Sequence, residues 1–318
     1  MSIRKSIATL IAFAAFWSIM AAPVWPLDKA TCMLDWYPNP DHVPIYLART
    51  EGHFAEQGLD VDIMVPADPN DPLKLVAAGK VDFAVSYQPS VIIASDRGLP
   101  LVSIGALVQH PLSCLLYLKD SGIQKVADLK GRRIGYSVEP LYRVLFEAVA
   151  EAVGLKSTDY QLFRVGYNLS PPLLSGQVDA VIGAFRNYEA IQIELQGRAV
   201  GIFPLEEHGI PDFYELIIIA HPRLIRENPE KASAFMTGLT KGIHQTLQEP
   251  ETSFNAFVKH LPELADELNR RSFEVTRPFF QGSPAQDTSR WEKMQAFMLH
   301  YGLIQQAVPI RDLVWPGR

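Results

Sequence analysis

The sequence predicts an α/β protein of two lobes, each a mostly parallel sheet flanked by helices, joined by a two-strand hinge. Three observations lead to this prediction. Short apolar runs alternate with amphipathic segments in two successive series, a strongly apolar run follows the second series, and the rest of the chain has a helical pattern. Strands that alternate with helices indicate βαβ units and therefore parallel sheets. The length of 318 residues is enough for two lobes that each bury a core.

The strands are predicted in short apolar runs and the helices in amphipathic stretches. The first series gives strands at Thr31–Trp36, Leu59–Val65, Phe83–Ser86, Val102–Val108 and Cys114–Leu118, with helices at Val43–Glu56, Pro72–Ala78 and Ser90–Arg97. The second series gives strands at Arg133–Tyr136, Tyr160–Val165, Ala180–Gly183 and Val200–Pro204, with helices at Leu141–Val153, Pro172–Gly176 and Tyr188–Gln196.

A buried strand is predicted at Phe213–Ala220, where the apolar run is strongest. Four helices are expected after it, and three of them open on proline, which suits a first helical turn. They are Pro229–Leu247, Pro250–Leu261, Pro262–Phe280 and Gln286–Tyr301.

This order predicts that the first lobe is made of two separate stretches, residues 28–116 and 208–318, and that residues 117–207 form the second lobe. The hinge is expected near Ser113–Leu118 and Ile210–Leu216. Ligands of parallel sheets lie at the carboxyl ends of the strands. Those ends are therefore expected to face each other across a cleft.

Residues 1–27 have the pattern of a signal peptide. Arg4 and Lys5 precede the apolar run Ile7–Met20, and two small residues, Ala21 and Ala22, follow it. The run is short for a membrane span, which needs about 20 residues. A retained N-terminal anchor is the alternative. We expect an exported protein, with a cleavage site between Ala21 and about residue 28.

The composition favours an ordinary globular protein and disfavours nucleic acid as a partner, because the net charge is −6. The chain contains no glycine-rich nucleotide loop, no zinc-protease helix motif and no nucleophile turn. No cofactor, metal ion or catalytic group is therefore expected. Cys32 and Cys114 could pair in an exported chain, but their apolar flanks favour two buried free thiols.

Six motifs resemble one known family. They are Leu34–His42 (LDWYPNPDH), Glu51–Val61 (EGHFAEQGLDV), Lys80–Pro89 (KVDFAVSYQP), Asp128–Tyr136 (DLKGRRIGY), Gln177–Val181 (QVDAV) and Gly209–Leu216 (GIPDFYEL). They are similar to the periplasmic component of ABC importers for formylaminopyrimidine or hydroxymethylpyrimidine, within a group that also holds sulfonate-binding proteins and the fungal pyrimidine synthase. The resemblance covers roughly residues 29–220. GHFAEQGL is typical of the whole group, whereas DWYPNPDH and YQP are narrower and favour a pyrimidine ligand.

The resemblance implies a periplasmic binding protein fold of type II. It also implies a monomer that binds a small heteroaromatic ligand and delivers it to an inner-membrane permease and its ATPase. The alternatives among binding proteins are riboflavin, another heterocycle or a sulfonate as ligand. The alternative from another class is an enzyme similar to the fungal synthase, which consumes its own histidine and pyridoxal phosphate. That enzyme carries a cysteine-rich loop, whereas the two cysteines here lie far apart in the sequence.

Candidate ligand-binding residues follow the strands of the first lobe. Trp36 ends the first strand, and an aromatic ring there can stack on a flat ligand. Asn39 and His42 provide donors and acceptors at the start of the next helix. Tyr87 ends the third strand and is expected to form a wall. Each has a structural alternative, as a core residue or as part of a first helical turn.

The second lobe and the hinge supply the other candidates. Tyr136 and Ser137 end a strand, where free backbone amides could hold a polar edge of the ligand. Phe185, Tyr188 and Glu189 end another strand, and the resemblance implies that this tyrosine and glutamate contact the aminopyrimidine. A helix start is the alternative for both. Glu215 lies in the apolar hinge strand, where a buried carboxylate requires partners, and its role could be structural.

Overall fold

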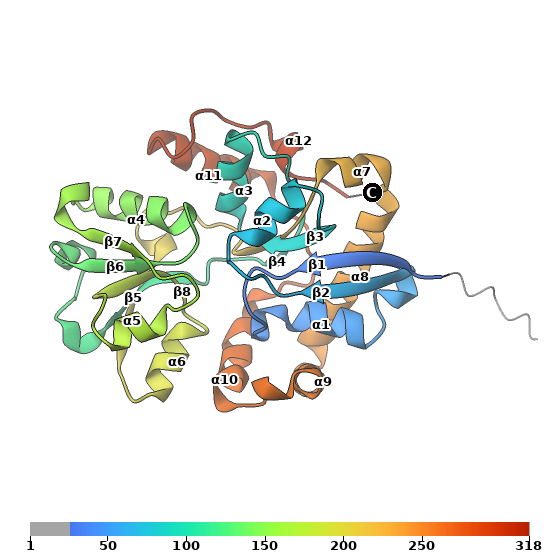
Figure 1. Ribbon diagram of the computed structural model, residues 1–318, viewed down its shortest axis with the longest axis horizontal. Helices are drawn as coiled ribbons and strands as arrows, with labels where there is room; N and C mark the ends of the chain where they lie inside the picture. Colours follow the sequence, from blue (N-terminus) through green and yellow to red (C-terminus); the bar gives the residue numbers. More distant parts are fainter. Residues whose placement is uncertain (1–25, 318) are drawn as a thin grey trace, which may run out of the picture.

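The computed structural model describes residues 26–317 and shows two lobes, each built around a five-stranded sheet (Figure 1). The first sheet has the order β2-β1-β3-β10-β4. β1 is parallel to β2 and β3, whereas β10 is antiparallel to both β3 and β4, so four strands share one direction. Its strands are β1 (Asp28–Met33), β2 (Leu59–Met64), β3 (Phe83–Ser86), β4 (Val102–Val108) and β10 (Leu216–Ala220).

The second sheet repeats this arrangement with the order β7-β6-β8-β5-β9. β6 is parallel to β7 and β8, and β5 is the antiparallel strand between β8 and β9. The strands are β5 (Ser113–Leu118), β6 (Arg133–Tyr136), β7 (Gln161–Arg164), β8 (Ala180–Phe185) and β9 (Val200–Pro204). The predicted α/β fold of two mostly parallel sheets is confirmed.

Helices cover both sheets, and the C-terminal helices return to the first lobe (Figure 1). α8 (Pro229–Gln248) packs closely on α1 (Val43–Thr50) at Gly242, where a Cβ atom would lie only 2.2 Å from the Pro44 carbonyl oxygen. The helices of the second lobe are α4 (Leu141–Ala152), α5 (Ser170–Leu174) and α6 (Glu189–Leu195). The others are α1 (Val43–Thr50), α2 (Asp71–Ala77), α3 (Gln88–Asp96), α7 (Pro222–Glu227), α8 (Pro229–Gln248), α9 (Pro250–His260), α10 (Glu267–Thr276), α11 (Thr288–His300) and α12 (Ile310–Leu313).

Two predicted helices are much shorter in the structure than expected. The helix predicted from Val43 to Glu56 ends at Thr50, and the chain turns before a separate 3₁₀ turn. The helix predicted from Pro262 begins at Glu267 instead. Asp266 is its cap, because the carboxylate accepts the backbone N–H of Asn269 at 2.8 Å.

Most of the predicted signal peptide, residues 1–27, lies outside the described residues. Within residues 26–317, none of the helices combines the length and the apolar character that a membrane span requires.

Cys32 and Cys114 lie in different sheets as buried free thiols, as the sequence favoured. Burial raises the pKa of the Cys32 thiol to about 12.

The chain crosses between the lobes twice, at residues 109–112 after β4 and at residues 205–215 after β9. The hinge expected near Ser113–Leu118 lies slightly earlier, because all of β5 pairs inside the second sheet. The division predicted between residues 116 and 117 therefore falls within a strand of that sheet.

The carboxylate of Glu215 joins the two crossing segments. Its Oε2 atom accepts the backbone N–H groups of Leu112 and Ser113, each at 2.7 Å, and the Ser113 hydroxyl at 2.6 Å. The side chain is fully buried, and this burial raises its pKa to about 7, against the opposing effect of the Ser113 hydrogen bonds. The hydrogen bonds that Glu215 accepts at the hinge therefore explain why a carboxylate is buried at this position.

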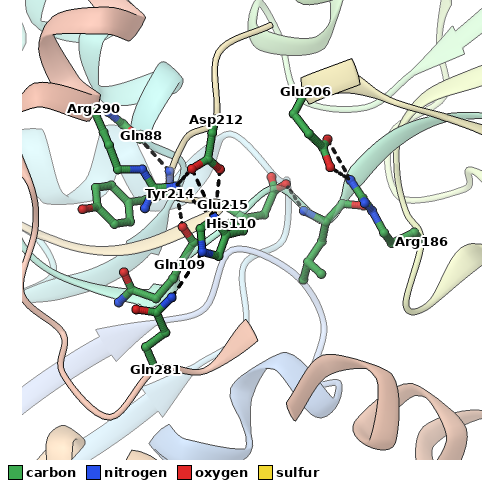
Figure 2. A network of polar contacts seen from close by, with 11 residues as sticks. Gln88, Gln109, His110, Arg186, Glu206, Asp212, Tyr214, Glu215, Gln281 and Arg290 are labelled. Carbon is green, nitrogen blue, oxygen red and sulfur yellow. Dashed lines mark hydrogen bonds and ion pairs between the residues drawn. The ribbon is translucent and has the colours of Figure 1, made fainter. Parts of the chain in front are cut away.

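A second cluster of polar side chains, partly exposed to solvent, lies at the same two crossing segments (Figure 2). Asp212 Oδ2 accepts from Arg290 at 2.7 Å, and Asp212 Oδ1 lies 3.0 Å from His110 Nδ1. Arg290 also donates to the Gln109 carbonyl at 2.6 Å. Arg290 thereby connects helix α11 to both crossing segments.

We predict that Glu215→Ala lowers the free energy of unfolding by at least about 2 kcal/mol, because a buried donor without an acceptor costs roughly 1–3 kcal/mol. Urea denaturation measures the change. Glu207→Ala, at an exposed position in the second crossing segment, is the control and should change stability little. Equal stability of the two variants would contradict a structural role for Glu215.

Candidate functional site

A small cavity lies between the lobes, where strands of both sheets end. Its volume of about 20 Å³ has room for about one water molecule. The first lobe contributes Asp35, Trp36, Asn39, Asp41 and Tyr87, and the second contributes Ser137, Tyr142, Leu169, Gly183, Phe185, Tyr188 and Glu189. Most of these residues follow β1, β3, β6 and β8. The cavity therefore lies at the carboxyl ends of these strands, where ligands of parallel sheets bind.

Aromatic side chains from both lobes meet beside the cavity. The ring centroids of Trp36 and Tyr167 lie 4.4 Å apart in an edge-to-face arrangement, and those of Tyr37 and Tyr188 lie 6.1 Å apart. The Tyr167 hydroxyl also donates to the Pro66 carbonyl at 3.0 Å. The lobes are therefore in contact, and a flat ligand would need these rings or the lobes to move.

Asp35 lines the cavity and is held by two neighbours. The Tyr87 hydroxyl donates to Oδ2 at 2.7 Å, and Oδ1 lies 2.9 Å from Nε2 of the fully buried His42. Since His42 Nδ1 accepts the backbone N–H of Asn39, Nε2 carries the ring proton and donates it to Asp35. His42 thus lies behind Asp35 and positions it.

Glu189 faces the cavity from the first turn of α6 and is only 5% exposed. Its Oε2 atom accepts the backbone N–H of Phe185 at 2.8 Å. Burial raises the pKa of Glu189 to about 7, opposed by backbone hydrogen bonds and reinforced by the charge of Asp41. Near neutral pH this carboxyl group can therefore either donate or accept a proton.

Tyr142 forms the wall next to the hinge. Its hydroxyl lies 3.4 Å from Glu215 Oε1, and its ring packs against Gly183. Gly183 has φ +86°, and a Cβ atom there would lie 2.4 Å from the ring. Only glycine accommodates both the positive φ and the close approach.

Seven predicted residues line the cavity: Trp36, Asn39, Tyr87, Ser137, Phe185, Tyr188 and Glu189. The polar groups of Asn39 are partly used by its own turn, where Oδ1 accepts the Asp41 N–H at 2.8 Å. Serine 137 is buried, and its Oγ atom has no hydrogen-bond partner among the described residues.

Three predicted residues lie outside the cavity wall. His42 is behind Asp35, and Glu215 is occupied by the hinge. Tyr136 is the last residue of β6, and side chains alternate between faces along a strand, so only its neighbour Ser137 reaches the cavity.

Sequence reasoning missed five lining residues: Asp35, Asp41, Tyr142, Leu169 and Gly183. Asp35 and Asp41 stand in the same DWYPNPDH run as three residues that were predicted, so this motif contained a signal for them. Tyr142, Leu169 and Gly183 have no comparable signal, because only the packing of the second lobe brings them to the cavity.

A second, larger cavity has a volume of about 150 Å³ and shares two lining residues, Asp35 and Tyr87, with the smaller one. It is lined by residues 138–140 of the second lobe and by α2 and α3, and it includes the cationic Lys74 and Arg97. Strand ends of both lobes line each of the two cavities, but only the smaller one has three carboxyl groups and no cationic side chain. We therefore take the smaller cavity as the candidate ligand site. Nowhere in residues 26–317 do three or more His, Cys, Asp or Glu side chains gather as a metal site.

Several solved structures with the same fold are named as binding proteins. The chain resembles the alkanesulfonate-binding protein SsuA of Xanthomonas axonopodis pv. citri, bound to MOPS, with a TM-score of 0.73 and 16% identity. The match covers 92% of this chain and 99% of that one. At this identity the likeness shows the fold alone, which is the predicted fold of periplasmic binding proteins.

Proteins related in sequence indicate the family, whereas the solved structures indicate only the fold. The chain is 41% identical over 297 residues to a Haemophilus influenzae protein assigned provisionally to thiamine biosynthesis, covering 92% of this chain and 94% of the relative. It is 31% identical to the formylaminopyrimidine-binding protein of Halalkalibacterium halodurans, covering 90% and 89% of the two chains. A 4-amino-5-hydroxymethyl-2-methylpyrimidine phosphate synthase of Saccharomyces cerevisiae is also 31% identical, with 85% and 82% covered. The family model described as NMT1/THI5 like matches residues 39–253, and the chain therefore belongs to this family.

Proposed function

We propose that this protein is the solute-binding component of an ABC importer that captures a thiamin-precursor pyrimidine, formylaminopyrimidine or hydroxymethylpyrimidine, in the periplasm. It would deliver the pyrimidine to an inner-membrane permease driven by an ATPase. The observation that carries the proposal is Glu189, a buried carboxyl group with a pKa of about 7 in a cavity with aromatic walls. The relative named for formylaminopyrimidine binding supports the same ligand class.

Glu189 suits the edge of a 4-aminopyrimidine, where a ring nitrogen lies beside an exocyclic amine. A protonated carboxyl group donates to the ring nitrogen and accepts from the amine. A carboxylate instead accepts from both the amine and the ring nitrogen when that nitrogen is protonated. Because the pKa of Glu189 is about 7, both states are accessible near neutral pH. The pair can therefore form with the proton on either partner.

The aromatic and charged walls support a flat ligand without negative charge. Trp36, Tyr87, Tyr142, Phe185 and Tyr188 provide faces and edges on which a heteroaromatic ring can pack. The carboxyl groups of Asp35, Asp41 and Glu189 would repel a sulfonate. A ring is larger than the present cavity, so we infer that the lobes separate to admit it and close around it.

The second candidate is an enzyme similar to the fungal synthases, favoured by their 31% identity to this chain. The resemblance implies that such an enzyme loses one of its own histidines when it reacts with pyridoxal phosphate. The intact mass after incubation with pyridoxal phosphate distinguishes the two candidates, since a binding protein keeps its mass.

Calorimetry with four ligands tests the proposal. We expect micromolar or tighter binding of formylaminopyrimidine or hydroxymethylpyrimidine, and no measurable binding of riboflavin or an alkanesulfonate, because the cavity is small and lined by carboxylates. Clear binding of riboflavin or the sulfonate, with no heat from either pyrimidine, would overturn the assigned ligand.

Trp36→Ala should weaken pyrimidine binding more than tenfold while the protein stays folded, because the ring packs on the ligand rather than only on Tyr167. Calorimetry gives the affinity and thermal unfolding gives the stability. Trp315→Ala, near the C-terminus and away from the cavity, is the matched control. If Trp36→Ala lowers the melting temperature but the folded fraction binds normally, Trp36 is a packing residue.

Glu189→Gln should lower pyrimidine affinity about tenfold to a hundredfold, since a hydrogen bond to a charged group contributes roughly 1.5–3 kcal/mol. Glutamine keeps the shape and removes the ionisable group. Glu151→Gln, at an exposed position of α4, is the control. An unchanged affinity in Glu189→Gln would leave Glu189 only as a residue of a helix start.

A further inference from the structure

A buried group of three polar side chains connects the lobes next to the cavity. Asp41 Oδ1, from the turn after β1, accepts from Asn187 Nδ2 at 2.7 Å and lies 3.0 Å from Thr276 Oγ1. The second amide hydrogen of Asn187 is donated to Thr276 Oγ1 at 2.6 Å. Asn187 belongs to the second lobe, while Asp41 and Thr276 belong to the first. None of the three is more than 1% exposed.

Only one oxygen of Asp41 takes part in this group. Oδ2 is buried and has no hydrogen-bond partner among the described residues, although Asp41 lines the cavity. Leaving a carboxylate oxygen without a donor in a buried site is costly. Burial raises the pKa of Asp41 to about 6, opposed by His42 and reinforced by the charge of Asp35.

The other two carboxylates of the cavity are already engaged. Both oxygens of Asp35 are bonded, to His42 and to Tyr87. Glu189 Oε2 accepts from the Phe185 backbone, and the proposed function assigns this carboxyl group to the ligand. Asp41 therefore has an oxygen that still requires a donor, and its other oxygen is fixed by a residue of the opposite lobe.

We propose that Asp41 is a second specificity-determining carboxylate, whose Oδ2 accepts a hydrogen bond from a ligand donor other than the one that faces Glu189. This inference rests on the proposed function and deepens it, because the site would select pyrimidines with two donor groups. Since Asn187 holds Oδ1 across the lobe interface, Oδ2 has a fixed direction when the lobes are together. The same carboxylate thus binds the ligand and connects the lobes around it.

A set of three ligands tests this role by calorimetry. The parent is 4-amino-5-hydroxymethyl-2-methylpyrimidine, the second compound is its 5-methoxymethyl ether, and the third has a dimethylamino group in place of the amine. Each derivative lacks the donor of one substituent. The proteins are the wild type, Asp41→Asn, Glu189→Gln and the control Asp62→Asn, at an exposed position of β2.

In the wild type, we expect each loss of a donor to weaken binding tenfold or more. Asp41→Asn lacks the acceptor for one of the two ligand donors. In this variant, removal of that donor should lower the affinity less than threefold, whereas removal of the other donor should lower it tenfold or more, as in the wild type. Glu189→Gln should show the converse, and Asp62→Asn should match the wild type. Asp41→Ser replaces Asp41→Asn if that variant does not fold.

A purely structural role gives a different pattern. If Asp41 only connects the lobes, Asp41→Asn weakens all three ligands by one factor, as Thr276→Val should do, and the inference is overturned. An affinity unchanged by Asp41→Asn overturns it as well. If the wild type binds no pyrimidine, the proposed function fails together with the inference, and this outcome is distinct from the other two.

Discussion

The buried carboxylate of Glu215 is the constraint on which the arrangement of the two lobes depends. One oxygen accepts three donors from Leu112, at the end of the other crossing segment, and Ser113, the first residue of β5, so the two connections are held as a unit. These donors are backbone and hydroxyl groups in a region without access to water, where an unpaired polar group is costly. Tyr142 contacts the second oxygen of Glu215 and also lines the cavity. The hinge and the site therefore share a side chain.

The cavity contains three carboxyl groups whose different partners give them different roles. Asp35 is bonded at both oxygens by His42 and Tyr87 and serves as a fixed wall. Glu189 and Asp41 keep bonding capacity and have pKa values raised by burial, to about 7 and about 6. A site of this kind favours ligands that bring donors or a proton. Under the proposed function, these carboxyl groups favour a ligand without negative charge, although the sulfonate-binding neighbours share the fold.

Much of the site was predictable from the sequence because its residues follow strands. Parallel strands place their carboxyl ends at one edge of a sheet, so Trp36, Tyr87, Ser137 and Glu189 were expected near one another before any coordinates. The alternation of apolar and amphipathic runs likewise located the strands of both sheets, and the strongest apolar run located β10, whose antiparallel pairing was not predicted. Local signals were sufficient here because each depends on residues within one strand and the turn that follows it.

The sequence by itself determined the two α/β lobes, the family motifs and the strand ends that meet at the cleft. Only the tertiary structure decided which side chain of each motif reaches the cavity, because neighbouring residues in a turn or strand point in different directions. It placed Asp35 in front of His42, Ser137 inside and Tyr136 outside, and assigned Glu215 to the hinge. The contact of Asp41, Asn187 and Thr276 joins three segments far apart in the chain. No local pattern encodes such a contact, since it exists only when both lobes and the C-terminal helices pack together.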